Sequence, residues 1–523
     1  MIFNVKHNLI KIVINQFTRF EKMKKNFLGS KMICFMLSAA ALTTFSACDD
    51  EENTPQETDG GLKVITEIVT DGNVIGNGDQ EVVFKGKQTI AKGTYVLKGW
   101  VYVADGSELT IEPGTVIRGD KQTKAALIVE RGGKIFAEGT ANEPIVFTSN
   151  EAAGQRRPGD WGGLILCGNA VNNQREQQIE GGPRSFHGGN NDADNSGVLK
   201  YVRIEFAGYP FEKDKEINGL TLGSIGSGTT IDYVQVSYSN DDSFEWFGGT
   251  VNCKHLVAFK GWDDDFDTDN GFSGKVQYAL SVRDSRIADT SQSNGFESDN
   301  CADGSQVSPY TTATFSNVTF FGPKYVDASF ENTTDYINAG SMNPNNGSAL
   351  GRFQSAMQIR RSSCLNCINS LAVGFPIGLI IDGEKGNTQE MASNGTVKLQ
   401  NVWFAGMDVT GTDANKLYDD YLVTGYDDEK KPIVDNTKES LSSTFFKSGA
   451  GNRIAEVSDL MLTGNSLVKG LNINFMPSAG SPLVSSASFS GFSGFDAVSY
   501  VGAFGTDNWL AGWTNFDPEN TAY

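Results

Sequence analysis

Histidine is nearly missing from this sequence, which holds 3 histidines among 523 residues. Only His187 and His255 follow the N-terminal segment, which argues against a histidine-rich metal centre and against a Ser-His-Asp hydrolase. Proline is scarce as well, at 14 residues, and long helical periodicity is lacking, whereas glycine is abundant at 59. Short alternating apolar runs lie between glycine turns, and this pattern predicts an all-β protein.

Positive charge is also in short supply, because 43 Lys and Arg stand against 63 Asp and Glu, for a net charge of −20. Seven of the basic residues and only one acid precede Cys48, so a chain cleaved there keeps 36 basic and 62 acidic residues, net −26. Such acidity argues against nucleic acid and anionic membrane surfaces as partners. It is compatible with the binding of cations.

Cysteine is sparse, and its spacing supports no familiar site. Cys364 and Cys367 have the spacing of a redox pair, but no thioredoxin-like βαβ pattern surrounds them, and a zinc site would need a second pair. The number of cysteines after Cys48 is odd, and an exported chain has the option of forming disulfides. These cysteines are Cys167, Cys253, Cys301, Cys364 and Cys367.

A long apolar run is missing too, and the longest near the N-terminus is Met32–Leu42. That is short of the ~20 residues that cross a bilayer. It follows the basic head Met23–Lys25 and precedes small residues, which is the pattern of a secretory signal. The sequence Phe-Ser-Ala before Cys48 resembles a bacterial lipobox. This resemblance implies cleavage before Cys48 and lipid on that cysteine, although an ordinary signal with a chance cysteine is the alternative.

Four acids, Asp49–Glu52, follow the cysteine directly. They resemble the acidic export tag of Bacteroidetes surface lipoproteins, which implies an outer-membrane, lipid-anchored protein facing the cell exterior; the alternative is a plain solvated tether. The expected division is an over-extended start (1–22), a signal peptide (23–47), an acidic flexible tether (48–62) and one domain (63–523).

The remainder of the chain repeats with a period of about 22 residues, which suits one coil of a solenoid. Tyr233, His255 and Gln277 begin similar strands one period apart, and Asp241 and Asp263 begin similar acidic strands at the same spacing. A related strand at Ser293 follows after a longer interval, which implies a loop insertion. This pattern resembles right-handed parallel β-helices of the pectate-lyase-like type, whose stacked coils share one core. Strand, glycine turn and strand also alternate in Leu109–Gly119, Ala126–Thr140 and Glu143–Ser149, and a further related strand begins at Asn218.

Stacking assigns opposite roles to neighbouring positions of these strands. We expect one inward ladder and one outward ladder, because successive side chains of a strand point to opposite faces. Carboxylates at equivalent positions of adjacent strands would lie ~4.8 Å apart, and like charges so close destabilise unless something compensates. The inward ladder is Leu220, Phe244, Phe266 and Phe296, and the outward ladder is Thr221, Glu245, Asp267 and Glu297.

A bound cation is the simplest compensation for such a ladder. Acids alternate along the segment that ends in Asn270-Gly271, which is similar to a calcium loop but lacks the later glutamate of an EF-hand. The predicted Ca²⁺ ligands are Asp263, Asp265, Asp267 and Asp269, and a weaker candidate contains Asp192 and Asp194. A solvated acidic turn and a pair of catalytic acids remain alternatives for the first segment.

The same acids could instead serve catalysis. A glycosidase needs two carboxylates at a set separation, and a lyase needs a cation with a basic side chain. The candidates are Asp242, Glu245, Asp264, Asp267 and, as a base, Arg203. The polygalacturonase Gly-His-Gly and Arg-Ile-Lys motifs are missing, and Arg203, Arg283, Arg360 and Arg361 are also explained as ion-pair partners.

Aromatic residues beside the acidic strands are candidates for sugar binding. Trp246 and Trp262 flank these strands, and tryptophan stacks on sugar rings, although burial in the core is the alternative. Glu297 joins them as a candidate ligand-binding residue on the outward ladder.

Longer stretches resemble a group of Bacteroidetes β-helix lipoproteins with no assigned biochemistry. The resemblance covers about residues 64 to 523 and implies the fold and the location, but it brings no catalytic residue. The expected function is a Ca²⁺-stabilised surface β-helix that binds a glycan or other extended ligand without established catalysis; the alternatives are a polysaccharide lyase or hydrolase, and an accessory subunit of an outer-membrane TonB-dependent transporter or an adhesin. The matching stretches are Gly159–Gly168, Ser196–Gly208, Asp241–Gly249, Asp263–Gly274, Val501–Gly505 and Trp509–Pro518.

Overall fold

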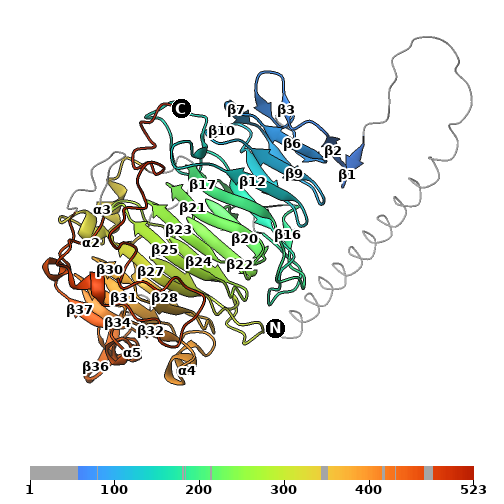
Figure 1. Cartoon of the computed structure of the whole chain (residues 1–523). Coiled ribbons are helices and arrows are strands. Elements are labelled where there is room, and N and C mark those ends of the chain that lie inside the picture. The colour runs from blue at the N-terminus through green and yellow to red at the C-terminus, as the bar shows by residue number, and fades with distance from the viewer. Residues whose placement is uncertain are drawn as a thin grey trace, which may run out of the picture. The chain divides into compact units, whose positions relative to one another are not determined.

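A computed structural model gives the structure of the protein (Figure 1). The predicted signal peptide and most of the predicted tether lie outside the described residues. No helix within the described part of the chain is long and apolar enough to cross a membrane. The structure describes residues 57–78, 80–179, 182, 184–212, 215–342, 351–414, 419–429, 431–463 and 475–523.

Two long sheets, which we call sheet A and sheet B, run through the described domain. Their strands pair in parallel, except at the start of the chain, where β1 with β2 and β3 with β4 are antiparallel. Parallel pairing between strands far apart in sequence is the arrangement of a parallel β-helix, so the predicted fold is confirmed.

The strands of sheet A, in their order across the sheet, are β1 (Thr58–Asp59), β2 (Leu62–Ile65), β5 (Val82–Phe84), β8 (Trp100–Val103), β11 (Ala126–Val129), β14 (Gly163–Cys167), β20 (Leu220–Ile225), β22 (Phe244–Gly249), β24 (Phe266–Asp269), β26 (Phe296–Ser298), β28 (Ser355–Ile359), β31 (Ile377–Ile381) and β34 (Val409–Thr412).

The strands of sheet B, in sequence order, are β3 (Val69–Thr70), β4 (Val74–Ile75), β6 (Lys87–Ile90), β7 (Thr94–Leu97), β9 (Glu108–Ile111), β10 (Val116–Gly119), β12 (Lys134–Glu138), β13 (Ile145–Ser149), β17 (Gly197–Glu205), β21 (Thr230–Ser237), β23 (Cys253–Phe259), β25 (Lys275–Val282), β27 (Thr314–Phe321), β29 (Asn366–Ile368), β30 (Leu371–Val373), β32 (Lys398–Gln400), β33 (Trp403–Ala405) and β37 (Arg453–Ala455).

Short elements interrupt the coils. Helix α5 (Leu441–Ser448) packs on the last coil, where Phe446 stacks on Phe404 with ring centroids 4.0 Å apart. The other helices are α2 (Pro323–Val326), α3 (Thr334–Asn338), α4 (Thr388–Ser393), η1 (Val457–Leu460) and η2 (Pro482–Ser485). Outside the two long sheets, antiparallel hairpins are formed by β15 (Gln177–Gln178) with β16 (Phe186–His187), β18 (Pro210–Glu212) with β19 (Lys215–Glu216), and β35 (Tyr421–Tyr426) with β36 (Pro432–Glu439).

The predicted ladders agree with the register of sheet A. Leu220 pairs with Phe244, Phe244 with Phe266, and Phe266 with Phe296, and all four side chains are fully buried. One predicted alignment in sheet B is wrong, because the structure places Tyr278 rather than Gln277 level with His255. The coil between β23 and β25 is therefore slightly longer than the sequence spacing indicated.

The start of the domain also differs from the prediction. Thr58 and Asp59 form β1 and pair with Lys63 and Leu62, inside the segment predicted to be a flexible tether. Lys85 bonds Asp59 at 3.0 Å, which ties this strand to a neighbouring coil. The described domain therefore begins at or before residue 57.

The long strands of sheet B bend at a stack of rings. Tyr201, Tyr233, His255 and Tyr278 each adopt a positive φ, between 49° and 62°, which is uncommon outside glycine. Their rings stack, with centroids 4.4 Å apart for Tyr201 and Tyr233, 4.1 Å for Tyr233 and His255, and 5.0 Å for His255 and Tyr278. Trp513, far along the chain, packs edge-on against Tyr233, so the C-terminal segment covers this stack.

Candidate functional site

The outer face of sheet A carries the predicted acidic ladder. Glu245 on β22 pairs with Asp267 on β24, which pairs with Glu297 on β26. Each acid directly follows a buried phenylalanine, so strand alternation turns it away from the core. Two residues further on, Asp269 and Asp299 face the same way by alternation, and their charges repel each other.

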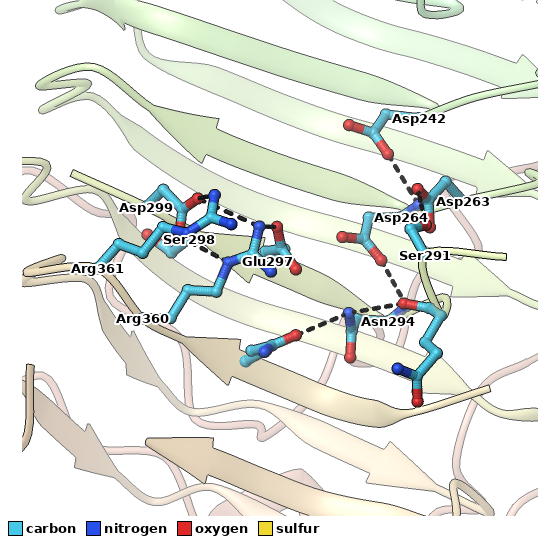
Figure 2. Close-up of polar contacts among 12 residues, drawn as sticks. Asp242, Asp263, Asp264, Ser291, Asn294, Glu297, Ser298, Asp299, Arg360 and Arg361 are labelled. Atoms are coloured by element: carbon cyan, nitrogen blue, oxygen red, sulfur yellow. Dashed lines mark hydrogen bonds and ion pairs between the residues drawn. The ribbon is translucent and has the colours of Figure 1, made fainter. Parts of the chain in front are cut away.

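At the starts of the same strands, side-chain oxygens accept hydrogen bonds from the backbone of the next coil. Asp242 Oδ1 accepts the backbone N–H of Asp264 at 2.8 Å, and Asp264 Oδ1 accepts that of Asn294 (Figure 2). Asn294 Oδ1 in turn accepts the N–H of Ser355 at 3.0 Å. Asp242 and Asp264, which the sequence marked as candidate catalytic acids, therefore each join one coil to the next through a hydrogen bond.

Two arginines neutralise one end of the acidic face, as Figure 2 shows. Arg360 forms ion pairs with Glu297 and, through Nε, with Asp299 Oδ1 at 2.8 Å. Arg361 Nη1 lies 2.6 Å from Asp299 Oδ2. Their interpretation as ion-pair partners is therefore confirmed.

A cavity of about 220 Å³ opens over this face. Seven carboxyl groups and only two guanidinium groups line it, which leaves a large negative excess among the described residues. The charged residues of this cavity, which we call the acidic cavity, are Asp241, Asp242, Glu245, Asp267, Asp269, Glu297, Asp299, Arg360 and Arg361.

The acids cluster most tightly at the end away from the arginines. One oxygen each of Asp242, Glu245 and Asp267 lies within 4.8 Å of the others. Asn218, which also lines the cavity and is 2% exposed, donates from Nδ2 to Glu245, while its Oδ1 has no hydrogen-bond partner among the described residues. Asp267 Oδ1 is likewise buried without a partner in the described part of the chain. Buried oxygens without donors are uncommon in folded proteins, and a bound water or ion is one explanation for them.

Burial and mutual repulsion perturb the ionisation of these acids. Burial, followed by the charge of Asp241, raises the pKa of Asp242, and burial with the charge of Glu245 raises that of Asp267. Burial and the charge of Asp299 raise the pKa of Asp269 to about 7. Burial raises the pKa of Glu297 to about 8 in spite of the neighbouring Arg360. The cluster therefore carries its full charge only with a compensating cation or at high pH.

The oxygen-only donor set suits a hard divalent cation such as Ca²⁺, which takes six to eight oxygen ligands. Asp242, Glu245, Asp267 and the amide oxygen of Asn218 supply carboxylate and carbonyl oxygens at one place. The orphaned Oδ1 of the deeply buried Asn218 is the observation that fits a cation best. No cysteine or histidine belongs to the group, which argues against a softer metal.

The predicted ligand segment does not come together as one site. Asp265 turns into the interior and pairs with Arg283 Nη1 at 2.8 Å, both side chains being fully buried. Asp263 accepts from Ser291 at 2.6 Å and groups with Asp241 and Asp242 instead. Asp265 is thus wrong as a ligand, because the strand begins only at Phe266 and alternation does not govern the turn before it.

Three further candidates lie away from the cavity. Trp246 and Trp262 are fully buried, so the prediction that they stack on sugar is wrong and their alternative role in the core holds. Trp246 packs between Phe244 and Phe272, and Trp262 Nε1 donates to Asp289 at 3.0 Å. Arg203 lies on β17 of sheet B, over the ring of Tyr523, and does not join the acids as a base.

Several cavity residues were not predicted as site residues. These residues are Asn218, Asp241 and Asp299, which line the cavity beside the acids that the sequence did predict. The ladder count was a usable signal for Asp299, which lies two positions beyond Glu297 and so faces the same way. Asp241 required knowledge of the turn geometry.

The second predicted motif, with Asp192 and Asp194, forms a separate turn in which Asp192 Oδ1 accepts the N–H of Val171 at 3.1 Å.

A smaller pocket of about 160 Å³ adjoins the acidic cavity and shares both arginines with it. We call it the mixed pocket, because Lys385 adds a third positive charge opposite two carboxyl groups. It is lined by Arg360, Arg361, Asp382, Glu384 and Lys385.

The chain was compared with known families, curated proteins and solved structures. Residues 82–457 match the family model described as "Pectate-lyase like beta helix domain". Among solved structures, pectate lyase Pel9A is 14% identical with a TM-score of 0.39, covering 82% of this chain and 89% of the other. The Dettilon tailspike protein (gp208) is 11% identical with a TM-score of 0.22, covering 73% of this chain and 63% of the other. No curated protein matches the sequence.

Proposed function

Because the chain belongs to the pectate-lyase-like β-helix family, we propose that it is a glycan-binding protein whose acidic cavity holds Ca²⁺. The ion would be held by Asp242, Glu245, Asp267 and Asn218. Bound there, it supplies positive charge that neutralises the carboxylates and attracts an anionic group of the ligand. The ligand class proposed is therefore an acidic, extended glycan, such as a uronate polymer.

One observation carries the proposal. The amide oxygen of Asn218 is buried and without a donor at the same place where three carboxylates converge within 4.8 Å. A buried carbonyl oxygen without a partner costs ~1–3 kcal/mol, and like charges so close repel. A cation coordinated by all four groups removes both penalties at once, whereas a proton on one acid supplies a single hydrogen bond.

Calorimetric titration of the mature chain with Ca²⁺ tests the site. We expect binding to the native chain, and a loss of at least tenfold in affinity for Asp267→Asn and for Glu245→Gln. Asp192→Asn is the matched control, because it makes the same substitution in the other acidic motif and should leave affinity unchanged. If the native chain takes up no Ca²⁺, or if Asp192→Asn weakens binding as strongly as Asp267→Asn, the proposed site is wrong.

Glycan binding is tested separately with uronate oligomers. The native chain should bind these oligomers in the presence of Ca²⁺ and release them when the ion is chelated. Asp267→Asn should fail to bind them with or without Ca²⁺. Equal binding with and without Ca²⁺ would contradict the role given to the ion.

The site is proposed to work at the cell surface, with the protein held in the outer membrane by lipid on Cys48. The basic head, short apolar run and acids after Cys48 support this location. A labelled fatty acid should be incorporated into the native chain but not into Cys48→Ser. Protease added to intact cells should cleave the native chain but not Cys48→Ser. An accessory role beside an outer-membrane transporter, or adhesion, would use the same anchor.

A hydrolase or lyase is the second candidate, because several carboxyl groups line one cavity and the pKa of one of them, Glu297, is raised to about 8. A carboxyl group that keeps its proton near neutral pH can act as a general acid. Release of new reducing ends or of unsaturated products from uronate polymers would establish catalysis. Loss of that activity in Glu297→Gln, with Ca²⁺ affinity retained, would assign the acid.

A further inference from the structure

The mixed pocket reverses the charge balance of the cavity beside it. In the acidic cavity seven carboxyls face two guanidiniums, whereas in the mixed pocket Arg360, Arg361 and Lys385 face only Asp382 and Glu384. The carboxyl of Asp382 is 4% exposed and already accepts the backbone N–H of Glu384 at 2.6 Å. Burial raises the pKa of this carboxyl group above its usual value.

The positive groups of the mixed pocket have donors available for a ligand. Arg361 uses Nη1 for Asp299, and a guanidinium carries five N–H donors in all. Lys385 is exposed and forms no ion pair with any residue in the described ranges. An ammonium and a planar guanidinium at one pocket are suited to bind a carboxylate.

The two cavities form one line across the coils. Glu245 lies on β22, and the mixed pocket is built from the residues that follow β28 and β31. Sheet A places these strands in the order β22, β24, β26, β28, β31, so four steps separate the ends. At ~4.8 Å per step the line is about 19 Å long.

Neither cavity can enclose a whole oligosaccharide. Their volumes, about 220 and 160 Å³, are below the ~300–1,000 Å³ of pockets that enclose a drug-sized ligand. The two cavities adjoin each other at Arg360 and Arg361, which line both of them. An extended ligand therefore fits this surface better than a compact one.

We propose that the mixed pocket is a second anion subsite, in which Arg361 and Lys385 bind a carboxylate of an acidic glycan that already contacts the acidic cavity. This inference rests on the proposed function. The cation end and the basic end differ in chemistry, so the ligand lies along the axis of the coils in one direction. Arg360 is a positioning residue, since its ion pairs with Glu297 and Asp299 fix the boundary between the two subsites.

The test measures affinity against ligand length. Galacturonate oligomers from dimer to hexamer are titrated in Ca²⁺ into the native chain, Lys385→Gln and Lys385→Glu. Lys398→Glu is the control, because Lys398 is an exposed lysine on β32 of sheet B. Lys385 is exposed and lies on the surface, so neither substitution threatens the fold.

In the native chain, affinity should rise with each added sugar until the oligomer reaches across both subsites. Lys385→Gln should reduce the affinity for the longer oligomers about threefold, and Lys385→Glu about tenfold, with the dimer unaffected. Lys398→Glu should match the native chain at every length. The pH and Ca²⁺ dependence of dimer binding should stay unchanged in both Lys385 variants.

The failures are distinguishable. If the dimer and the longer oligomers bind in Ca²⁺ but Lys385→Glu changes neither, or changes both equally, the second subsite is wrong and the proposed function stands. If no oligomer binds the native chain in Ca²⁺, the proposed function fails and the second subsite fails with it.

Discussion

On sheet B the rings of Tyr201, Tyr233, His255 and Tyr278 stack coil upon coil, and on sheet A the carboxyls of Glu245, Asp267 and Glu297 do the same. Both stacks follow from one rule, because a parallel solenoid places equivalent side chains of successive coils ~4.8 Å apart. Stacked rings attract, at ~0.5–1.5 kcal/mol per pair, whereas like charges repel.

The two stacks are therefore completed in different ways. The aromatic stack is covered by the chain itself, with Trp513 edge-on to Tyr233 and Trp509 edge-on to His255. In the acidic stack Arg360 pairs with Glu297, Arg361 pairs with the neighbouring Asp299, and the stack lines a cavity in which the described acids outnumber the described basic residues. Stacked rings are stable without a further partner, whereas stacked acids need a counter-charge to offset their repulsion. This difference is the physical basis for the proposed cation.

The largest expected effect comes from removing a counter-charge that the chain supplies itself. Arg283→Met leaves Asp265 buried without its partner, so the free energy of unfolding should fall by ~3–5 kcal/mol, equally with and without Ca²⁺. Urea denaturation measures this. Adding Asp265→Leu to the same chain should recover most of the loss, and a loss that Ca²⁺ relieved would place Asp265 in the cation site after all.

The pH dependence of stability should be the next largest effect. The pKa of Asp269 is raised to about 7 and that of Glu297 to about 8, above their unfolded values, so the folded chain binds more protons and stability is lost as pH rises through this range. Without Ca²⁺ the free energy of unfolding should fall by ~2–4 kcal/mol between about pH 4 and pH 8. Urea denaturation across this range should show a smaller decline in saturating Ca²⁺, because a nearby cation favours the charged form of these acids, and a decline of equal size in both buffers would contradict the compensation.

Breaking the aromatic stack should cost somewhat less and should ignore Ca²⁺ altogether. Tyr233→Ala removes two stacked contacts and an edge contact with Trp513, for an expected loss of ~2–3 kcal/mol. Tyr421→Ala, at an exposed tyrosine of hairpin β35–β36, is the control and should cost under ~0.5 kcal/mol. Equal losses in thermal melts of the two variants would mean that the stack adds nothing.

The fold was predictable because the same residue types recur in successive coils, and strand alternation decides without ambiguity which of them point inward. Phe244, Phe266 and Phe296 recur at the first inward position, so the register of sheet A and its outward acids followed by counting. The same alternation puts Trp246, two positions after Phe244, inside; that signal was available and outweighs its closeness to the acids.

Other parts of the site lay beyond such counting. Asp265 precedes the first residue of β24, where turn geometry decides the direction of a side chain. Arg360 and Arg361 follow a coil between Phe296 and its partner Met357 that is far longer than the repeat, so no period places them beside Glu297. Counter-charges supplied across an insertion are visible only in three dimensions.

The smallest expected effect distinguishes Asp267, which lies on β24, from Asp265, which lies in the turn before that strand. Asp267→Asn removes one of several like charges from the acidic stack, so without Ca²⁺ at pH 8 it should raise the free energy of unfolding by ~1 kcal/mol. Asp265→Asn should lower it, because Arg283 then loses its buried partner. In saturating Ca²⁺ the order of Asp267→Asn and the native chain should invert, since only the native chain gains from the ion. If Asp267→Asn destabilises the chain in both buffers, the acids of sheet A are held by contacts within the chain, and the difference between the two stacks disappears.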